Sequence, residues 1–251
     1  MASMTKSVSL RGPNNSNGPK SGHLAYNRRM EQARSSESFA GVTVGEFVER
    51  LSSGEPVPGG GAASAVAAAL GASLVSMVAA LSKGKPKYAI YGQTLGRCEA
   101  VGRELGAELL ALSDRDAEAY AGYSAALKMP RETDDQQKAR RSAIQIAARD
   151  ASDAPFACVK ACARLLVAAE ALAGRSNVNA ASDVLVAALL GEAAARGAAE
   201  NVLINLPMTG DESYSESMRW QVDVVLHEIA AGAARTREIV LSGQSRDPEQ
   251  A

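Results

Sequence analysis

The sequence is poor in aromatic residues, histidine and cysteine, and each shortage removes a class of function. Among 251 residues only 4% are Phe, Trp or Tyr, and there are two histidines and three cysteines. Cys98, Cys158 and Cys162 are too few for a disulfide framework and lack the Cys/His spacing of a zinc site. His23 and His227 do not suffice for a histidine triad or a histidine-bound metal. Catalysis would therefore rest on carboxylates, amides, lysine, arginine or tyrosine.

The charge balance gives no sign of a nucleic-acid partner. Lys and Arg total 27 against 28 Asp and Glu, for a formal net charge of -1, and no basic surface is expected from so even a distribution. A small molecule is the expected partner, with neither nucleic acid nor membrane. Cys158 and Cys162, one helical turn apart, are interpreted as small buried residues in a reducing cytoplasm.

The chain divides into three regions by composition. Residues 1–40 contain few apolar residues, many Asn, Ser, Gly and Arg, and no apolar stretch of signal-peptide length. We interpret them as a disordered N-terminal extension, with a transit peptide as the alternative. Residues 41–243 are predicted to form one helical domain, and residues 244–251 a flexible C-terminal tail.

Helix signals recur throughout residues 41–243. Three capping boxes predict helix starts near residues 44, 134 and 214: Thr43-x-x-Glu46, Thr133-x-x-Gln136 and Ser213-x-x-Glu216. Prolines 130, 155 and 207 fall where helices would start or stop. The predicted helices span residues 44–53, 60–82, 92–128, 134–152, 155–173, 180–204 and 214–242. The fold class is all-α, a bundle of long Ala-rich helices whose small side chains let backbones approach closely.

Residues 60–82 contain no charge, and their length fits a membrane span. The segment is rich in Ala, Gly and Ser and has no aromatic residue for an interfacial belt, which favours a buried helix of a soluble bundle. We expect a homodimer with an extensive helical interface to cover its remaining face.

Gly59, Gly60 and Gly61 begin this helix. Their uncovered N–H groups at a positive helix end suit an anion or a flat ring, and the alternative is a tight turn that permits close packing. The segment lacks the Lys-Ser/Thr of a P-loop, which disfavours ATP.

Polar residues also lie on the apolar helix 180–204. Asn179 and Asp183 are one turn apart on one face of this helix. Asn201, five turns after Asp183, lies at the same azimuth as Asp183. These groups would need partners inside the bundle. The alternative is that Asn177, Asn179 and Ser182 cap the helix, with Asp183 in its first turn.

Two further groups have both a binding and a structural interpretation. Asp116, Tyr120 and Tyr123 lie at i, i+4 and i+7, where they could hold and stack on a heteroaromatic ring, or form an exposed Asp beside half-buried tyrosines. Lys83, Lys85 and Lys87 could receive the carboxylates of a ligand, or form a solvated helix end.

Four segments in this order resemble the formiminotransferase-cyclodeaminase family, in its cyclodeaminase and methenyltetrahydrofolate cyclohydrolase branch: PVPGGGAASAVAAALGASLVSMVAALSKGKPKY, DAEAYAGYSAALKMPRETDDQQKARRSAI, ASDAPFACVKACARLL and NVNAASDVLVAALLGEAAARGAAENVLINL. The resemblance covers roughly residues 42–242. It implies an all-α homodimer that acts on a one-carbon-substituted tetrahydrofolate without a metal. No cofactor is expected beyond that substrate.

The resemblance also implies site residues by position. The family's motifs look like Lys85, Lys87 and Tyr88, the acidic Asp116, residues 130–133, Arg140, and Asn177, Asn179, Ser182 and Asp183. Pro86 stands between lysines where the family commonly has three successive basic residues, which brings the local backbone and the contribution of each lysine into question.

Methenyltetrahydrofolate carries an amidinium cation whose bridging carbon is attacked by water, and a carboxylate can stabilise the cation and accept the proton. Asp183 or Asp116 is the expected catalytic residue, with the other holding the pterin. Lys85 and Lys87 would bind the glutamate tail, and the three glycines and Tyr120 would contact the rings.

Three functions remain open. Hydrolysis of 5,10-methenyltetrahydrofolate to 10-formyltetrahydrofolate is preferred, because the 40-residue extension is too short for a transferase domain and ASDAPFACVKACARLL resembles stand-alone cyclohydrolases. The alternatives are a formiminotetrahydrofolate cyclodeaminase that releases ammonia, and a non-catalytic folate-binding or scaffold bundle, which Pro86 favours. An enzyme should place Asp116, Asp183 and Lys85 around one pocket, at a subunit boundary.

Overall fold

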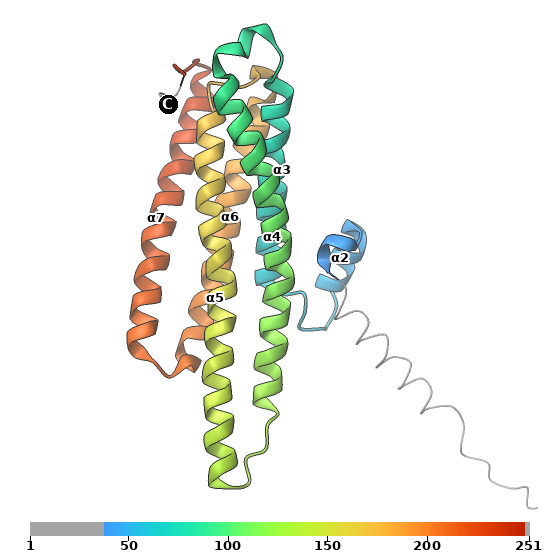
Figure 1. Cartoon of the computed structure of the whole chain (residues 1–251), viewed down its shortest axis with the longest axis vertical. Coiled ribbons are helices and arrows are strands. Elements are labelled where there is room, and N and C mark those ends of the chain that lie inside the picture. The colour runs from blue at the N-terminus through green and yellow to red at the C-terminus, as the bar shows by residue number, and fades with distance from the viewer. Residues whose placement is uncertain (1–37, 249–251) are drawn as a thin grey trace, which may run out of the picture. The chain divides into compact units, whose positions relative to one another are not determined.

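The computed structural model describes residues 38–248, which form a bundle of long helices (Figure 1). These helices are α3 (Gly60–Ser82), α4 (Gly92–Leu127), α5 (Asp134–Leu172), α6 (Ala181–Asn205) and α7 (Glu212–Ser242). A short helix, α2 (Val44–Leu51), precedes them. The 3₁₀ turns are η1 (Phe39–Gly41), η2 (Pro86–Tyr91), η3 (Val178–Ala180) and η4 (Leu206–Thr209). No strand occurs within residues 38–248, and the predicted all-α fold is confirmed.

Two of the three predicted capping boxes are present. Thr43 Oγ1 accepts the Glu46 N–H at 3.2 Å, and the Glu46 carboxylate accepts the Thr43 N–H at 2.8 Å. Thr133 and Gln136 form the same reciprocal pair at the start of α5. Both pairs satisfy backbone donors that the first helical turn leaves open.

The third helix start differs from the prediction, because Asp211 rather than Ser213 caps α7. Its carboxylate accepts the Tyr214 N–H at 3.0 Å and the Ser213 hydroxyl at 2.7 Å. A carboxylate at a helix N-terminus also interacts favourably with the helix dipole. The helix therefore begins at Glu212, two residues before the predicted start.

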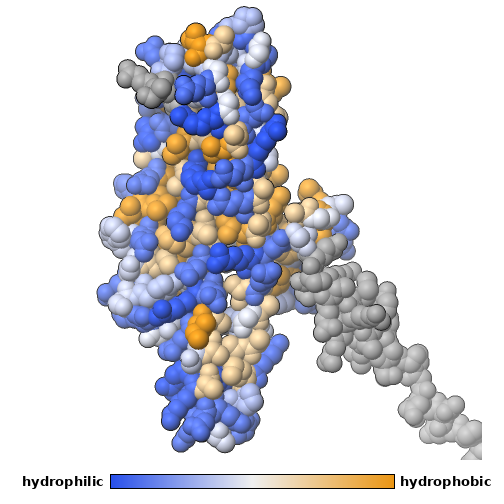
Figure 2. All heavy atoms as spheres, viewed as in Figure 1, coloured by the Kyte–Doolittle hydropathy of each residue, from blue (hydrophilic) through white to orange (hydrophobic). Residues whose placement is uncertain are grey.

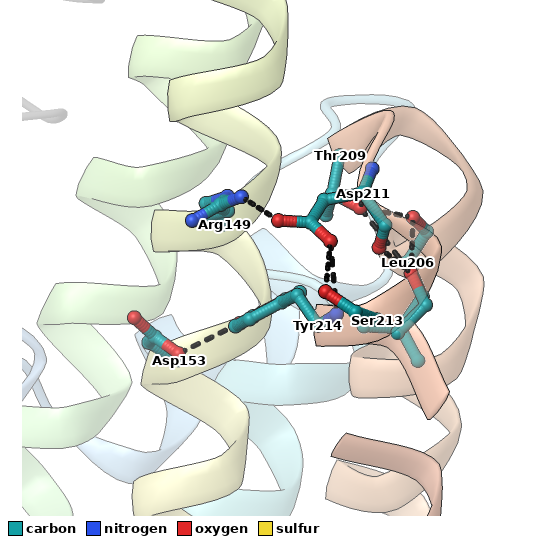
Figure 3. Close-up of polar contacts among 8 residues, drawn as sticks. Arg149, Asp153, Leu206, Thr209, Asp211, Ser213 and Tyr214 are labelled. Atoms are coloured by element: carbon teal, nitrogen blue, oxygen red, sulfur yellow. Dashed lines mark hydrogen bonds and ion pairs between the residues drawn. The ribbon is translucent and has the colours of Figure 1, made fainter. Parts of the chain in front are cut away.

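The same carboxylate ties α7 to α5 (Figure 3). Asp211 accepts a charged hydrogen bond from Arg149 of α5 at 2.5 Å, and the Arg149 guanidinium lies 5.0 Å from the Tyr214 ring. The Tyr214 hydroxyl donates to Asp153 at 2.9 Å. These contacts hold the turn between α6 and α7 against the middle of α5.

α5 runs without interruption through Pro155, so the predicted division into helices 134–152 and 155–173 is wrong. Proline has no N–H, and the carbonyl four residues earlier, that of Ala151, loses its helical donor. The Asn205 side chain from α6 donates to this carbonyl at 2.8 Å. A side chain from another helix thus compensates for the bond that the proline removes.

Small residues allow the backbones of neighbouring helices to approach closely. A Cβ added at Gly102 of α4 would lie 2.7 Å from both Ala72 O and Ser76 N of α3. A Cβ added at Gly71 of α3 would lie 3.1 Å from Ala187 O of α6. α3 accordingly packs against α4, α5 and α6, as the Ala-rich and Gly-rich composition predicts.

α3 and the segment 178–209 are long and apolar enough to cross a membrane, judged by length and composition alone. Only 44% and 39% of their most apolar stretches are buried within the bundle. The outward sides of α3 and α6 bear large apolar residues that are 40–55% exposed, namely Leu70, Met77, Leu81, Val186 and Leu189. We call these five residues the α3–α6 face.

The two ends of the chain are only partly described. The predicted disordered extension lies, up to residue 37, outside the described residues, as do residues 249–251. Within the predicted flexible tail, the Arg246 N–H donates to Gly174 O at 3.0 Å and its carbonyl accepts the Tyr91 hydroxyl at 2.7 Å. The Arg175 side chain also donates to Asp247 O at 2.6 Å. Residues 246 and 247 are therefore held against the end of α5.

The pairing of Asn205 with Pro155 can be tested by a double-mutant cycle. Asn205→Ala should lower the free energy of unfolding by about 1–3 kcal/mol, because the Ala151 carbonyl loses its donor. Pro155→Ala returns an N–H to that carbonyl, so the same Asn205→Ala change should cost markedly less in that background. Chemical denaturation of the four variants measures both costs, and equal costs would contradict the compensation.

Candidate functional site

Asp116 of α4 lies against the first turn of α3. The residue before that turn, Gly59, offers no side chain to cap the helix, and the Asp116 carboxylate instead accepts the Ala62 N–H. A Cβ added at Gly61 would lie 2.1 Å from Asp116 Oδ1. The glycine is therefore what allows the carboxylate to reach the main chain at the positive end of the helix.

Burial raises the pKa of Asp116 above its ordinary value of 3.8, and the hydrogen bond from the Ala62 N–H opposes this rise only in part. Desolvation disfavours the charged form of a carboxylate, which makes Asp116 a stronger base than an exposed aspartate. A shifted carboxylate at a helix end is a candidate for proton transfer or for pairing with a cation.

Asn201 of α6 lies at the same end of the bundle. Its Nδ2 lies 3.3 Å from the position of a Cβ added at Gly60 and donates to Gly197 O at 2.8 Å. The sequence drew attention to Asn201 because it shares the azimuth of Asp183 on α6, five turns away. The structure places it beside the glycines. We call Gly59, Gly60, Gly61, Asp116 and Asn201 the carboxylate cluster.

Tyr120 and Arg140 lie near this end of the bundle. Tyr120, one turn after Asp116 on α4, is 42% exposed. The Arg140 guanidinium donates to Leu127 O at 3.0 and 3.3 Å, across the hairpin between α4 and α5. Arg140 also lines a groove of about 490 Å³ between α5 and η4, and η4 follows α6 just beyond Asn201.

A second group of predicted residues assembles where η2 meets η3. The Val178 N–H donates to the hydroxyl of the buried Tyr88 at 3.1 Å. The Asn177 N–H donates to Ser82 Oγ, at the end of α3, at 2.7 Å, and Asn177 Oδ1 accepts the Asn179 N–H at 3.2 Å. These bonds join two segments that are far apart in the sequence.

The remaining members surround this junction. Lys85 and Lys87 are exposed, with Lys87 Nζ 5.5 Å from the Tyr88 ring centroid. Ser182 is exposed and Asp183 half-buried in the first turn of α6. We call the whole group the lysine cluster: Lys85, Lys87, Tyr88, Asn177, Asn179, Ser182 and Asp183.

Pro86, which departs from the family pattern, is the first residue of η2. Proline fits the first position of a helical turn, because its fixed φ suits the turn and no N–H is needed there. The neighbouring Tyr88 keeps its hydrogen bond to Val178. The proline is therefore accommodated without loss of the junction between η2 and η3.

The two clusters lie at opposite ends of α3. This helix of 23 residues is about 33 Å long at 1.5 Å per residue, and the 18 residues from Asp183 to Asn201 span about 27 Å. Within one chain, therefore, Asp116 and Asp183 do not share a pocket, and Lys85 lies with Asp183 only. The expectation of one pocket around all three is not met by a single subunit.

Residues 38–248 contain no group of three His, Cys, Asp or Glu side chains that could hold a metal ion. Cys98, Cys158 and Cys162 are buried, and none of them forms a disulfide within this part of the chain. Their burial agrees with their interpretation as small core residues.

Comparison with known proteins identifies close relatives. Residues 43–224 match the family described as formiminotransferase-cyclodeaminase. A methenyltetrahydrofolate cyclohydrolase of Methylorubrum extorquens is 36% identical over 200 residues, which cover 80% of this chain and 96% of that protein. The formimidoyltransferase-cyclodeaminase of Rattus norvegicus is 32% identical, over 79% of this chain but only 37% of the rat protein.

A solved structure has the same fold. The crystal structure of a formiminotetrahydrofolate cyclodeaminase from Thermotoga maritima superposes with a TM-score of 0.73 at 27% identity. The match covers 81% of this chain and 98% of that one. The helical arrangement is therefore shared over nearly the whole of that protein.

Gly61→Ala tests whether the contact between the glycine and Asp116 matters. The added methyl group would displace the carboxylate from the start of α3, and we expect activity to fall at least about tenfold. Gly96→Ala is the matched control, because nothing lies within 4 Å of a Cβ added at this position of α4. It should leave activity unchanged and raise stability slightly. Equal activities of the two variants would contradict the role of the contact.

Proposed function

Because this chain belongs to the formiminotransferase-cyclodeaminase family, we propose that it hydrolyses 5,10-methenyltetrahydrofolate to 10-formyltetrahydrofolate in one-carbon metabolism. The observation that carries the proposal is the Asp116 carboxylate, which is half-buried against the first turn of α3. The relative named a cyclohydrolase is matched over 96% of its length. The predicted family, enzyme class and folate substrate agree with the names of the relatives.

The chemistry of the substrate suits a half-buried carboxylate. The methenyl bridge is an amidinium cation, and Asp116 supplies the opposite charge in a partly dehydrated setting. Water adds to the bridging carbon as the carboxylate accepts its proton. The proton is then returned to N5 as the bond from that nitrogen to the carbon breaks, and the hydroxyl of the adduct releases its own proton to water, which leaves a formyl group on N10. The raised pKa of Asp116 assists the first proton transfer.

The other residues bind the substrate. The absence of a side chain at the exposed Gly60 allows a flat ring to lie against the main chain, beside the Asn201 amide. Tyr120 offers a face for stacking. Lys85 and Lys87 pair with the carboxylates of the glutamate tail, and Asn177, Asn179 and Asp183 present hydrogen-bonding groups beside them. No cofactor is required beyond tetrahydrofolate.

A homodimer is proposed because neither cluster alone can hold the whole substrate. The α3–α6 face is apolar and uncharged, so it is complementary to a second copy of itself. A two-fold axis across the middle of α3 would run this helix antiparallel to its partner. Each carboxylate cluster would then meet the lysine cluster of the partner subunit, which forms two composite sites. This dimer would also cover the apolar helices in the cytoplasm.

Cyclodeamination is the second candidate, and the similarity to the Thermotoga maritima cyclodeaminase favours it. In that reaction N10 attacks the formimino carbon, ammonia leaves, and the ring closes to the same methenyl cation. Asp116 would act at the same carbon, on related proton transfers in the opposite direction. The scaffold alternative gains nothing from Pro86, since that residue is accommodated at the start of η2.

Asp116→Asn tests the catalytic assignment. The amide can still accept the Ala62 N–H but cannot take a proton, so kcat/KM for methenyltetrahydrofolate should fall by about 10²–10⁴-fold. The melting temperature should stay the same or rise, because a partly desolvated charge is removed. Loss of methenyltetrahydrofolate absorbance measures the rate. The control is Glu118→Gln, which also removes one negative charge from α4 but at an exposed position.

The pH profile sharpens this test. The carboxylate acts when ionised, so the wild-type rate should rise with pH through an apparent pKa above 3.8, and this limb should vanish in Asp116→Asn. Turnover of formiminotetrahydrofolate alone would assign cyclodeamination. An Asp116→Asn protein as active as Glu118→Gln would contradict the carboxylate mechanism.

Subunit complementation tests the composite site. Asp116→Asn and the double variant Lys85→Ala, Lys87→Ala should each be impaired as homodimers. Co-expressed and randomly assorted, they should recover about a quarter of wild-type activity, because half of the dimers are mixed and each mixed dimer has one intact site. Each variant co-expressed with itself is the control, and the absence of recovery would contradict the antiparallel pairing.

A further inference from the structure

α2 carries an apolar stripe that its own subunit leaves uncovered. Val44, Val48 and Leu51, spaced i, i+4 and i+7, lie on one side of the helix and are 79%, 57% and 39% exposed. Only Phe47 of this helix is buried, edge-on against Phe39 with ring centroids 5.4 Å apart. α2 lies apart from the long helices (Figure 1), and apolar residues reach the surface there (Figure 2).

The position of α2 is set by hydrogen bonds that precede it. Ser38 Oγ and the Phe39 N–H of η1 donate to the two carboxylate oxygens of Asp114 on α4, at 2.6 and 2.7 Å. Asp114 is two residues before Asp116. After α2, the exposed residues 52–56 lead to the glycines that begin α3. The helix is thus anchored beside the carboxylate cluster.

We propose that α2 docks on a second copy of this chain, on the surface formed by η2 and η3, and closes the composite site. The inference rests on the proposed homodimer. If the α3 helices run antiparallel, α2, which precedes the first residue of α3, comes beside the partner's η2, which follows the last. Leu81, Ile90 and Val178 on that surface are 47%, 65% and 58% exposed. They offer apolar side chains against which the apolar stripe of α2 can pack.

Charge complementarity favours this partner. Residues 44–59 carry three acidic side chains and one basic, for a net charge of -2, whereas residues 83–91 carry three lysines and no acid, for a net charge of +3. Glu46 is used in the capping box and Lys83 pairs with Glu99 at 2.6 Å. Glu55 therefore remains to face Lys85 and Lys87. Pairing α2 with the partner's α2 would instead bring like charges together.

The docked helix would act as a positioning element for the substrate. It would remove Val44, Val48 and Leu51 from water. Residues 52–58 would then cross the boundary between the carboxylate cluster of one subunit and the lysine cluster of the other. Because α2 contributes no reacting group, its disruption should weaken substrate binding more than the chemical step, and so raise KM more than it lowers kcat.

Cysteine cross-linking between subunits tests the docking. Two differently tagged chains, one with Val48→Cys and one with Ile90→Cys, are co-expressed and oxidised, and a covalent heterodimer should appear on a non-reducing gel. A disulfide requires Cα atoms within about 7 Å. The matched control replaces Val48→Cys with Glu49→Cys, which lies outside the apolar stripe because successive residues of an α-helix are about 100° apart, and its yield should be several-fold lower. The native cysteines are buried.

A kinetic variant provides a second measurement. Val48→Glu should raise the KM for methenyltetrahydrofolate at least about fivefold with kcat nearly unchanged, whereas Glu49→Gln should change neither. Cross-linking specific to Val48 together with the higher KM supports docking and closure. Equal cross-linking from Val48 and Glu49, or no cross-linking and an unchanged KM, would overturn the proposal.

Failure of the docking and failure of the proposed function give different results. Specific cross-linking between the Val48→Cys and Ile90→Cys chains, together with a wild-type protein that turns over neither folate substrate, would reject the activity and keep the docking. An active dimer without specific cross-linking or a KM effect rejects the docking alone. A monomer in sedimentation, with no cross-link, rejects the homodimer and the docking together.

Discussion

The close approach of the α3 backbone to α4 and α6 is the constraint on which the rest of the structure depends. At Gly102 and Gly71 a single added methyl group would meet backbone atoms of the neighbouring helix. The same lack of side chains at the start of α3 allows Asp116 to lie against its first turn. One compositional feature, the use of glycine where α3 meets its neighbours, thus accounts for both the close packing of α3 and the geometry of the candidate site.

Two opposing effects act on the ionisation of the Asp116 carboxylate. The positive end of α3 and the Ala62 N–H favour the ionised carboxylate, whereas burial disfavours it. The upward shift of the pKa means that burial is the larger effect. An ionised carboxylate whose pKa is raised lowers the stability of the fold at neutral pH, and such arrangements are typical of sites whose residues are placed for chemistry.

The proposed antiparallel dimer would explain both the exposed apolar residues and the separation of the two clusters. A monomer leaves the α3–α6 face exposed to water and keeps Asp116 far from the lysine cluster. A two-fold pairing along α3 would cover that face and bring unlike ends together. The same dimer would cover the apolar stripe of α2, because α2 adjoins the end of α3 where the partner's η2 would lie.

Features that depend on neighbouring residues were predictable from the sequence. The capping boxes at Thr43 and Thr133 are local hydrogen bonds, and the uncharged helix that begins with glycines follows from composition. The family resemblance, carried by motifs in a fixed order, implied the all-α fold and Asp116. Spacing also gave the azimuth of Asn201 on its helix, because 3.6 residues per turn holds for any α-helix.

Features that depend on contacts between helices were decided only by the tertiary structure. Asn205 reaches Ala151 across 54 residues and keeps α5 continuous through Pro155, and Asp211 displaces Ser213 as the cap of α7 because it also meets Arg149. The position of Asn201 beside the glycines and the distance between Asp116 and Asp183 also depend on how the helices pack. Sequence spacing fixes a position along and around one helix, whereas the packing of small side chains determines which helix lies opposite.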